Sequence, residues 1–398
     1  MPKSPTPQTS LDCPKCRYTL NGNQETILCP ACGTAYFLDW GDTAQQPDLQ
    51  KQPALNRGLH FYMYHSQDAD GTGLDALRLL IPAGWQTNGG ITWHIDNPSM
   101  PAELHLQVFS PDENEMFEIL PAKSFFWNNN PLSLLTNPIG SGYLGCEIQP
   151  PITARQAFQK IFLQRYRPIP ELEIINLDHL PDFPNQLKSI NPFEQKSPNC
   201  TDGVQARIRY PHLGILNEEE VISVVELAWF ASPTSIAGNE IAVWSCDFLF
   251  CYRALSGQIN KQYEIFRTLL GSFHLSRRWY LQMMRLSQYL LQNQDTVEDD
   301  IHHLLKKLDK TLDNNEDMIL DSYDQRQRTI EHIYHQVAQP DRYMDIYRER
   351  EAGATVELPT GYRAAWSNGS GEYIVTDEPY YDPNGFFNQS WTKLRRLG

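Results

Sequence analysis

Four cysteines near the start of the chain could bind a metal ion. They form two CxxC pairs, Cys13 with Cys16 and Cys29 with Cys32, and 12 residues (17–28) separate the pairs. Each CxxC turn directs two thiolates at one point, so two turns complete a tetrahedral shell of four sulfur ligands. We expect one structural zinc ion here, because a full shell leaves no position for a catalytic water. Rubredoxin-like iron, or four buried or redox-paired thiols, are the alternatives.

The residues around these cysteines have the pattern of a short β-module. Strand-forming residues occur at 18–20, 26–28 and 35–38, and an Asn21-Gly22 turn follows the first of them. Such a module is too small to bury a core, so zinc would supply much of its folding energy. With its two CxxC pairs, the region 1–42 resembles a zinc ribbon.

Two carboxylates inside apolar strands are candidates for acid–base chemistry. Glu226 lies in the apolar run 221–230 and Asp247 in the run 242–252. If the strands pair, both acids could project from one face of a sheet, and burial would raise their pKa values. The pair could then act as general acid and base. Alternatively Arg207 and Arg209, on the polar face of the strand 204–210, neutralise them in a structural ion-pair network.

Two further cysteines invite a second metal or redox interpretation. Cys246 and Cys251 are five residues apart, so in a regular strand their side chains point to opposite faces. Cys246 alternates with Trp244, Phe248 and Phe250, which form an apolar face. We therefore expect buried core thiols rather than redox partners.

A histidine pair and several aromatic clusters are weaker signals. His332 and His335 have an HxxH spacing that could bind a metal, although a solvated helix face is the simpler interpretation. Aromatic residues in turn-rich segments are either interface anchors or loop residues folded back on the core. These aromatic residues are Phe125, Phe126, Trp127, Tyr380, Tyr381, Phe386, Phe387 and Trp391.

Strand and helix signals along the chain predict an α+β multi-domain protein. We expect a zinc ribbon at 1–42, a linker at 43–72, an antiparallel sheet with flanking helices at 73–283, an amphipathic helical segment at 284–340 and a small aromatic β-meander at 341–398. Helices are predicted at 153–166 and 258–272, where apolar residues recur with a period of 3.6.

The element order between residues 75 and 280 resembles the PsbP/Mog1 type of α/β/α module. The resemblance includes an Ile-Pro-Ala-Gly-Trp string at 81–85, a Gly-Ser-Phe string at 271–273 and Trp279. Members of that group mostly act as accessory or binding proteins, so the resemblance implies a binding role. It identifies no functional residues in this chain.

Composition limits the function classes. The chain has 398 residues, 41% of them hydrophobic, and a formal net charge of −15. This negative charge argues against a general nucleic-acid binder, which needs clustered Lys and Arg. The start has no apolar signal segment, no uncharged apolar run is long enough to cross a membrane, and the cysteine usage suits a reducing compartment. We therefore expect a cytoplasmic protein that contacts neither membrane nor nucleic acid.

Together these features favour a non-catalytic, zinc-binding adaptor or assembly factor that binds a protein partner. The closed zinc shell and the aromatic tail motivate this prediction, and neither GxxxxGK[ST] nor GxSxG occurs in the chain. One alternative is an enzyme that uses Glu226 and Asp247 as a carboxylate pair in a cleft. The other is a zinc ribbon that contacts nucleic acid.

Overall fold

The chain forms two compact units, Met1–Pro53 and Ala54–Gly398. The computed structural model describes residues 11–12, 19–20, 26–28, 35–37, 58–183, 185–187, 190, 199–231, 240–293, 316–337, 344–348 and 355–397. In the first unit, β1 (Leu11–Asp12) pairs antiparallel with β2 (Thr19–Leu20), and β3 (Thr26–Leu28) with β4 (Ala35–Phe37). The four cysteines expected to bind zinc lie outside the described residues.

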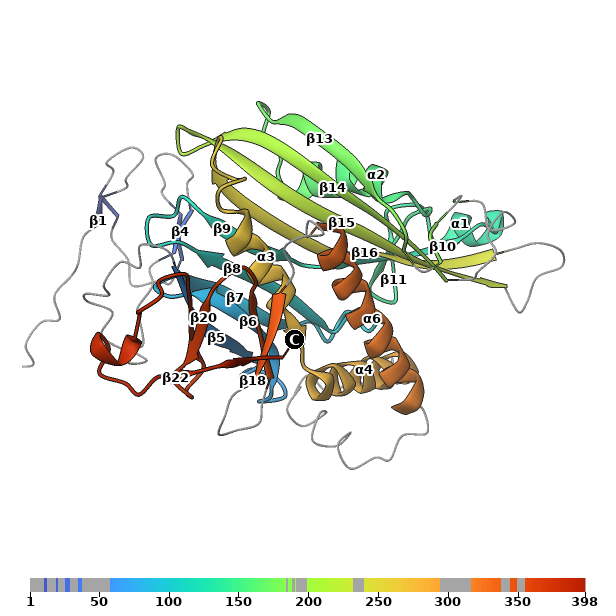
Figure 1. Cartoon of the computed structure of the whole chain (residues 1–398). Helices are drawn as coiled ribbons and strands as arrows, with labels where there is room; N and C mark the ends of the chain where they lie inside the picture. The colour runs from blue at the N-terminus through green and yellow to red at the C-terminus, as the bar shows by residue number, and fades with distance from the viewer. Residues whose placement is uncertain are drawn as a thin grey trace, which may run out of the picture. The chain divides into compact units, whose positions relative to one another are not determined.

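The second unit is built on a ten-stranded sheet (Figure 1). Its strands are β7 (Gln86–Trp93), β8 (Ala102–Phe109), β9 (Met116–Leu120), β10 (Lys123–Asn128), β11 (Gly142–Tyr143), β12 (Cys146–Ile148), β13 (Glu173–Leu180), β14 (Asn199–His212), β15 (Ile215–Ala231) and β16 (Glu240–Leu255). All neighbours pair antiparallel except β10 and β12. On one side β16 pairs with β15. On the other it pairs with β10 through residues 241–246 and with β9 through 249–253.

Two smaller sheets complete this unit. A six-stranded sheet contains β5 (Gly58–Gln67), β6 (Asp75–Pro82), β17 (His274–Leu275), β20 (Ala364–Ser367), β21 (Glu372–Thr376) and β22 (Thr392–Lys393). A three-stranded sheet contains β18 (Met344–Arg348), β19 (Thr355–Pro359) and β23 (Arg395–Arg396). Strand β21 pairs with β5, so the last strands of the chain complete a sheet begun by the first strands of the unit.

The described helices are α1 (Pro131–Thr136), α2 (Ala154–Ala157), the π-helix η1 (Phe158–Tyr166), α3 (Tyr263–Ser272), α4 (Arg277–Gln292), α6 (Glu316–Val337) and the short 3₁₀ helix η3 (Pro383–Gly385). Of these, α2 and η1 pack on one face of the large sheet, and α3, α4 and α6 pack on the other. The segment α2–η1 confirms the helix predicted at 153–166. It begins with a capping box between Thr153 and Gln156, which satisfies the first free amides.

Each face of the large sheet has its own hydrophobic core. One core packs Phe250 and Tyr252 of β16 against α3, α4 and α6, through residues such as Leu269, Trp279 and Ile330. The other packs residues of β14, β15 and β16 against α2 and η1. Both faces of β16 are therefore buried, which explains why its sequence is almost continuously apolar.

A buried carboxylate fastens three elements of the first core together. Asp68 follows β5 and is 1% exposed. It accepts hydrogen bonds from the indole nitrogens of Trp93 in β7 (2.8 Å) and Trp279 in α4 (3.0 Å). The backbone amide and the hydroxyl of Thr72 also donate to it, both at 2.8 Å. These four donors satisfy the buried charge.

The prediction of an α+β fold class is wrong, because the protein is mostly β. Of the described residues 46% are in strands and 24% in helices. The C-terminal strands do not form one separate meander: β20, β21 and β22 extend the sheet of β5 and β6, and only β18, β19 and β23 form a small sheet of their own. Helix α6 places Ile319, Ile330 and Ile333 in the core of the large sheet, so it is no independent amphipathic segment. Local periodicity identifies such elements but not the sheets that they join.

Candidate functional site

Glu226 and Asp247 lie on the same face of the large sheet. In the antiparallel pair of β15 and β16, Glu226 is opposite Ser245, and Val224 is opposite Asp247. The two acids are therefore diagonal neighbours, and residues two apart along a strand share one face. The prediction that they project from one face is confirmed.

A β-bulge next to Asp247 changes the alternation of β16. Ile222 is opposite Phe250 and Val224 is opposite Asp247, so Ser223 of β15 faces two residues of β16. Phe248 has a positive φ of 50°, and its amide donates a 2.7 Å hydrogen bond to the Asp247 carboxylate. As a result Asp247 and Phe248, although consecutive, both face α6.

The bulge also overturns the expected placement of two cysteines. Cys246 and Cys251 were predicted on opposite faces, but both lie in the core beneath α2 and η1, because the bulge reverses the alternation between them. Phe248 lies in the opposite core, not with Cys246. Both thiols are 0% exposed, and burial raises the pKa of Cys246 to about 12. The interpretation as buried core thiols agrees with this placement.

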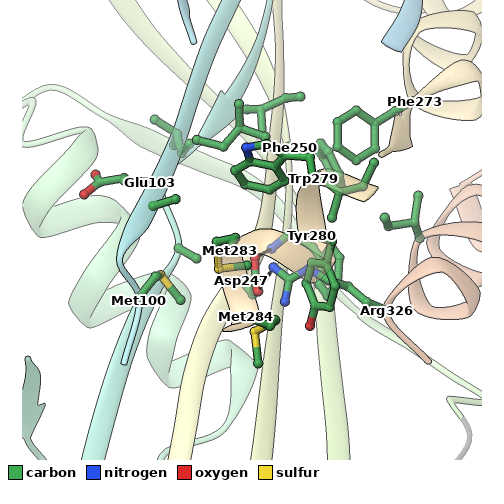
Figure 2. Close-up of a pocket in the computed structure, with 18 of the residues that line it drawn as sticks. Met100, Glu103, Asp247, Phe250, Phe273, Trp279, Tyr280, Met283, Met284 and Arg326 are labelled. Atoms are coloured by element: carbon green, nitrogen blue, oxygen red, sulfur yellow. Dashed lines mark hydrogen bonds and ion pairs between the residues drawn. The ribbon is translucent and has the colours of Figure 1, made fainter. Parts of the chain in front are cut away.

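The cation that neutralises Asp247 comes from α6, not from β14. Arg326 forms an ion pair with the Asp247 carboxylate (Figure 2). Its guanidinium carbon lies 4.8 Å from the ring centre of Phe248. Burial opposes the charge on Arg326, but the neighbouring Asp247 outweighs it and the pKa of Arg326 is raised. The cation is thus held by one carboxylate and one ring face.

Glu226 is less well compensated. Its nearest hydrogen-bond donor is the hydroxyl of Thr329, one turn after Arg326, at 3.5 Å. Burial raises the pKa of Glu226 to about 7; the nearby Arg326 opposes this rise and the charge of Asp247 adds to it. Two carboxylates share one guanidinium, so the group carries one excess negative charge when both acids are ionised.

Arg207 and Arg209 do not neutralise these acids, contrary to the proposed alternative. Arg207 pairs with Glu220 at 2.8 Å and Arg209 with Glu218 at 2.9 Å, each arginine directly opposite its glutamate in β15. A two-residue turn at 213–214, with φ values of 51° and 78°, sets this register. The structural network therefore exists, but with other partners.

The ion pair of Asp247 and Arg326 lies on the border between two cavities. One, of about 240 Å³, is lined mainly by apolar and aromatic side chains of β8, β9, β16, α4 and α6, including Met283, Met284 and Trp279 (Figure 2). The second, of about 290 Å³, is lined mostly by polar residues and by Glu226. Asp247, Arg326 and Met100 line both cavities.

This arrangement suits binding better than proton transfer. A carboxylate pair used for acid–base catalysis should line one pocket without a fixed cation on either member. Glu226 and Asp247 do line one cavity, but Asp247 is held by Arg326. An apolar cavity with a few charged groups at one end is the usual form of a small-molecule binding site.

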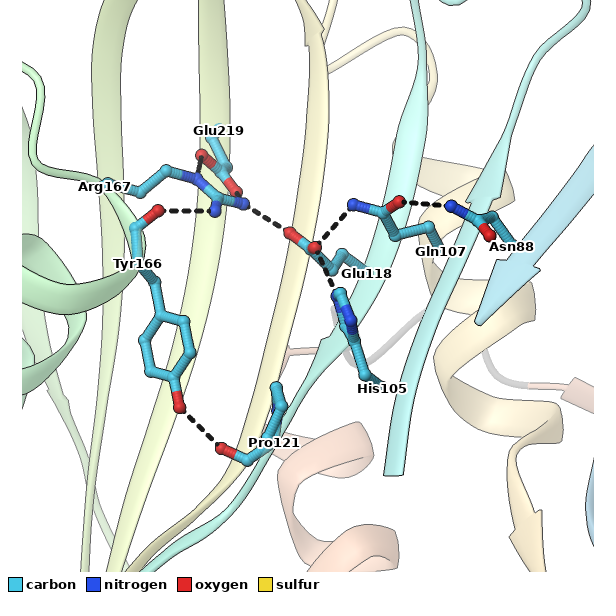
Figure 3. A network of polar contacts seen from close by, with 8 residues as sticks. All are labelled: Asn88, His105, Gln107, Glu118, Pro121, Tyr166, Arg167 and Glu219. Carbon is cyan, nitrogen blue, oxygen red and sulfur yellow. Dashed lines mark hydrogen bonds and ion pairs between the residues drawn. The ribbon is translucent and has the colours of Figure 1, made fainter. Parts of the chain in front are cut away.

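A second buried ion network lies on the opposite face of the sheet (Figure 3). Arg167, which follows η1, reaches Glu118 of β9 at 2.6 Å and Glu219 of β15 at 2.7 Å. Glu118 also contacts the Nε2 atom of His105 at 2.9 Å and accepts a 2.7 Å hydrogen bond from Gln107. Burial would raise the pKa of Glu118, but these contacts outweigh it and lower the pKa to about 2. The network joins the end of η1 to the sheet and has a structural role.

Other residues singled out in the sequence lie apart from this border. His332 Nε2 is 3.0 Å from the carbonyl oxygen of Pro181, a contact that fastens α6 to the chain after β13.

Within the ranges that the structure describes, no group of three or more His, Cys, Asp or Glu residues is placed to hold a metal ion. A GxGxxG string at 140–145 contains β11 and ends just before its antiparallel partner β12, whereas a dinucleotide site needs the string between a strand and a helix.

The aromatic clusters divide between core and surface. Phe125 is buried and stacks on Trp244 with ring centres 4.0 Å apart, so it folds back on the core. Trp391 is also buried. In contrast, Tyr380 is 96% exposed and Phe386 is 60% exposed. Phe125 and Trp391 therefore fold back on the core, whereas Tyr380 and Phe386 do not.

Arg326 is the site residue that sequence reasoning missed. The apolar stripe of α6 includes Ile319, Tyr323, Ile330 and Ile333, and Arg326 occupies the position between the second and third of these. The spacing of 4, 3, 4 and 3 residues places the guanidinium on the buried face. A charge inside an apolar stripe signals a buried partner of opposite sign.

Comparison with known proteins identifies no family. No protein-family model matches this chain, and no curated protein matches it. A solved crystal structure from Bacteroides thetaiotaomicron aligns with 75% of this chain and 85% of its own, at 8% identity and a TM-score of 0.20, which is too low to support an argument. Among the described helices, none is both long and apolar enough to cross a membrane.

Proposed function

We propose that this protein is a non-catalytic adaptor or assembly factor of the cytoplasm, and that it binds a protein partner. The observation that carries the proposal is the ion pair of Asp247 and Arg326. The carboxylate pair was the best candidate for catalysis, and one of its members is held by a guanidinium that also packs on Phe248. A proton-transfer pair constrained in this way is poorly suited to turnover.

A zinc ribbon at residues 1–42, with one structural zinc ion bound by Cys13, Cys16, Cys29 and Cys32, is part of the proposal. The spacing of the two CxxC pairs supports it. The strands supply further support: one CxxC pair falls between β1 and β2, and the other between β3 and β4, both of which are antiparallel pairs. Two hairpins that each carry one CxxC turn are the framework that a Cys₄ site needs.

The exposed aromatic residues near the C-terminus support a role in protein binding. Tyr380 and Phe386 present large apolar surfaces to solvent, and Phe386 stacks on Tyr381 with ring centres 5.6 Å apart. Aromatic side chains of this kind are enriched among the residues that anchor protein interfaces.

Metal analysis and affinity capture with the full chain test the proposal. We expect one zinc per chain by elemental analysis, and loss of that zinc when all four CxxC cysteines are replaced by serine. Proteins retained by the wild-type chain from its native lysate should be lost with the serine variant or with a Tyr380→Ser/Phe386→Ser variant. Absence of bound metal, or an identical set of captured proteins for all three chains, would contradict the proposal.

A further inference from the structure

We propose that the border between the two cavities binds an amphipathic cation, an alkylammonium compound whose charged head lies beside Asp247 and Glu226 and whose alkyl chain occupies the apolar cavity. This site is separate from the zinc ribbon and does not depend on it.

The apolar cavity is suited to an alkyl chain. Its wall combines the flexible side chains of Met100, Met283 and Met284 with the rings of Phe250 and Trp279 (Figure 2). Methionine side chains adapt to irregular apolar shapes, and aromatic rings add a large contact area. The wall therefore favours a flexible hydrocarbon over a rigid polar molecule.

The border is suited to a positive head group. Glu226 and Asp247 place two carboxylates there against one guanidinium, that of Arg326. An ammonium ion would compensate the excess negative charge and remove the cost of holding Glu226 ionised in a buried place. Tyr280, which also lines the apolar cavity, offers a ring face that attracts a cation.

An anionic head is disfavoured at the same place. Arg326 is already engaged by the Asp247 carboxylate and by the face of the Phe248 ring. A carboxylate ligand would have to compete with Asp247 and would stand near Glu226. The polar cavity at the border reaches the surface, because its lining residues Ser322 and Gln325 are exposed, so a ligand head can approach from solvent.

Glu103 provides a matched internal comparison. It lines the apolar cavity as Asp247 does, but it is paired with His94 at 3.3 Å and with Lys123 at 3.6 Å. Its charge is compensated by groups outside the cavity. We therefore assign the head group to the border with Glu226 and not to Glu103.

Calorimetric titration of the full chain with four probes tests this site. The probes are n-octylamine, n-octanol, octanoate and ethylamine, with n-octylamine and octanoate below their critical micelle concentrations and n-octanol below its solubility limit. We expect n-octylamine to bind at least about tenfold more tightly than each of the others, since it alone combines the positive head and the chain. Equal or tighter binding of n-octanol or octanoate, or no binding of n-octylamine, would overturn the proposal.

Two glutamine variants locate the head group. Glu226→Gln should weaken n-octylamine about tenfold and leave n-octanol unchanged, whereas Glu103→Gln should leave both unchanged. Filling the apolar cavity with Ala122→Leu should weaken both probes. If Glu226→Gln binds n-octylamine as the wild type does, the assignment is wrong.

The pH dependence provides a second readout on the wild-type chain. The groups facing Glu226 are Arg326 and Thr329 from α6, Asp247 from β16 and the uncharged Thr201 opposite it in β14. Affinity for n-octylamine should rise as the pH increases through about 7, because Glu226 loses its proton there while an alkylamine stays charged. Affinity for n-octanol should stay constant. A flat profile for the amine would contradict the role of Glu226.

Discussion

Arg326 of helix α6 reaches back 79 residues to form an ion pair with Asp247 of strand β16. The bulge in β16 makes this contact possible, because it turns both Asp247 and Phe248 toward the helix. The guanidinium therefore finds a carboxylate and a ring face side by side. One local irregularity thus connects the sheet, the helix and both cavities.

Removing this cation should destabilise the fold. The Arg326 side chain is 27% exposed and the Asp247 side chain 8% exposed. We expect Arg326→Met to lower the free energy of unfolding by about 2–4 kcal/mol, because Asp247 is left buried without its partner. Combining it with Asp247→Asn should cost less than the sum of the two single changes. Urea denaturation of the four proteins measures this.

A more exposed ion pair supplies the control for that cycle. Arg165 pairs with Glu147 at 2.6 Å, and their side chains are 42% and 28% exposed. Arg165→Met should change the free energy of unfolding by less than about 1 kcal/mol. Equal losses at positions 326 and 165 would show that burial of the pair contributes nothing.

Glu226 should make stability fall as the pH rises toward neutrality. Its pKa is about 7 in the folded protein against an ordinary value of 4.5, so between these values the folded chain holds a proton that the unfolded chain has released. The free energy of unfolding therefore decreases across this window, by at most about 3 kcal/mol. Glu226→Gln should flatten the curve measured by denaturation between about pH 5 and about pH 8.

Glu173→Gln is the matched control for this pH dependence, because the Glu173 side chain is 62% exposed. Its curve should follow that of the wild type. If the free energy of unfolding of the Glu226→Gln protein depends on pH as steeply as that of the wild type, the raised pKa of Glu226 is refuted.

The network around Arg167 should have the opposite pH dependence. The pKa of Glu118 is about 2 in the folded protein against 4.5 ordinarily, so its contribution is present above 4.5 and is lost as the pH falls toward 2. Arg167→Met should cost about 3–5 kcal/mol at neutral pH, because Glu118 and Glu219 stay buried without their cation. Denaturation with acid and with urea tests this; a loss under 1 kcal/mol would contradict it.

The Asp68 carboxylate should be a major stabilising group of the first core. Asp68→Ala leaves the indole N–H groups of Trp93 and Trp279 without their acceptor, and we expect a loss of about 2–4 kcal/mol in the free energy of unfolding. The tryptophan fluorescence of the folded state should shift as well. Asp70→Ala, two residues away at an exposed position, should change neither quantity. Wild-type stability in the Asp68→Ala protein would refute this role.

Part of the candidate site could be predicted from the sequence. Alternation along two apolar strands allowed Glu226 and Asp247 to share one face if the strands paired, since a strand has a period of two wherever it is regular. The partners of Arg207 and Arg209 were also within reach: a two-residue turn at 213–214 fixes which residues of β14 and β15 are opposite. Arg326 stood in an apolar stripe, and that pattern already demanded a buried anion.

The rest was decided by contacts between distant segments. The alternation of β16 reverses at Phe248 because β10 pairs with it before this point and β9 after it, and no local pattern marks that change of partner. This reversal of the alternation places Cys251 on the same face as Cys246. Likewise β21 joined β5 rather than forming its own module.

By itself, the sequence determined the CxxC spacing, most strands and the identity of the two acids, because these depend on neighbours along the chain. Only the tertiary structure decided the fold class, the bulge and the pairing of Arg326 with Asp247. These three features depend on which segments, far apart in the sequence, pack together and bury one another's side chains.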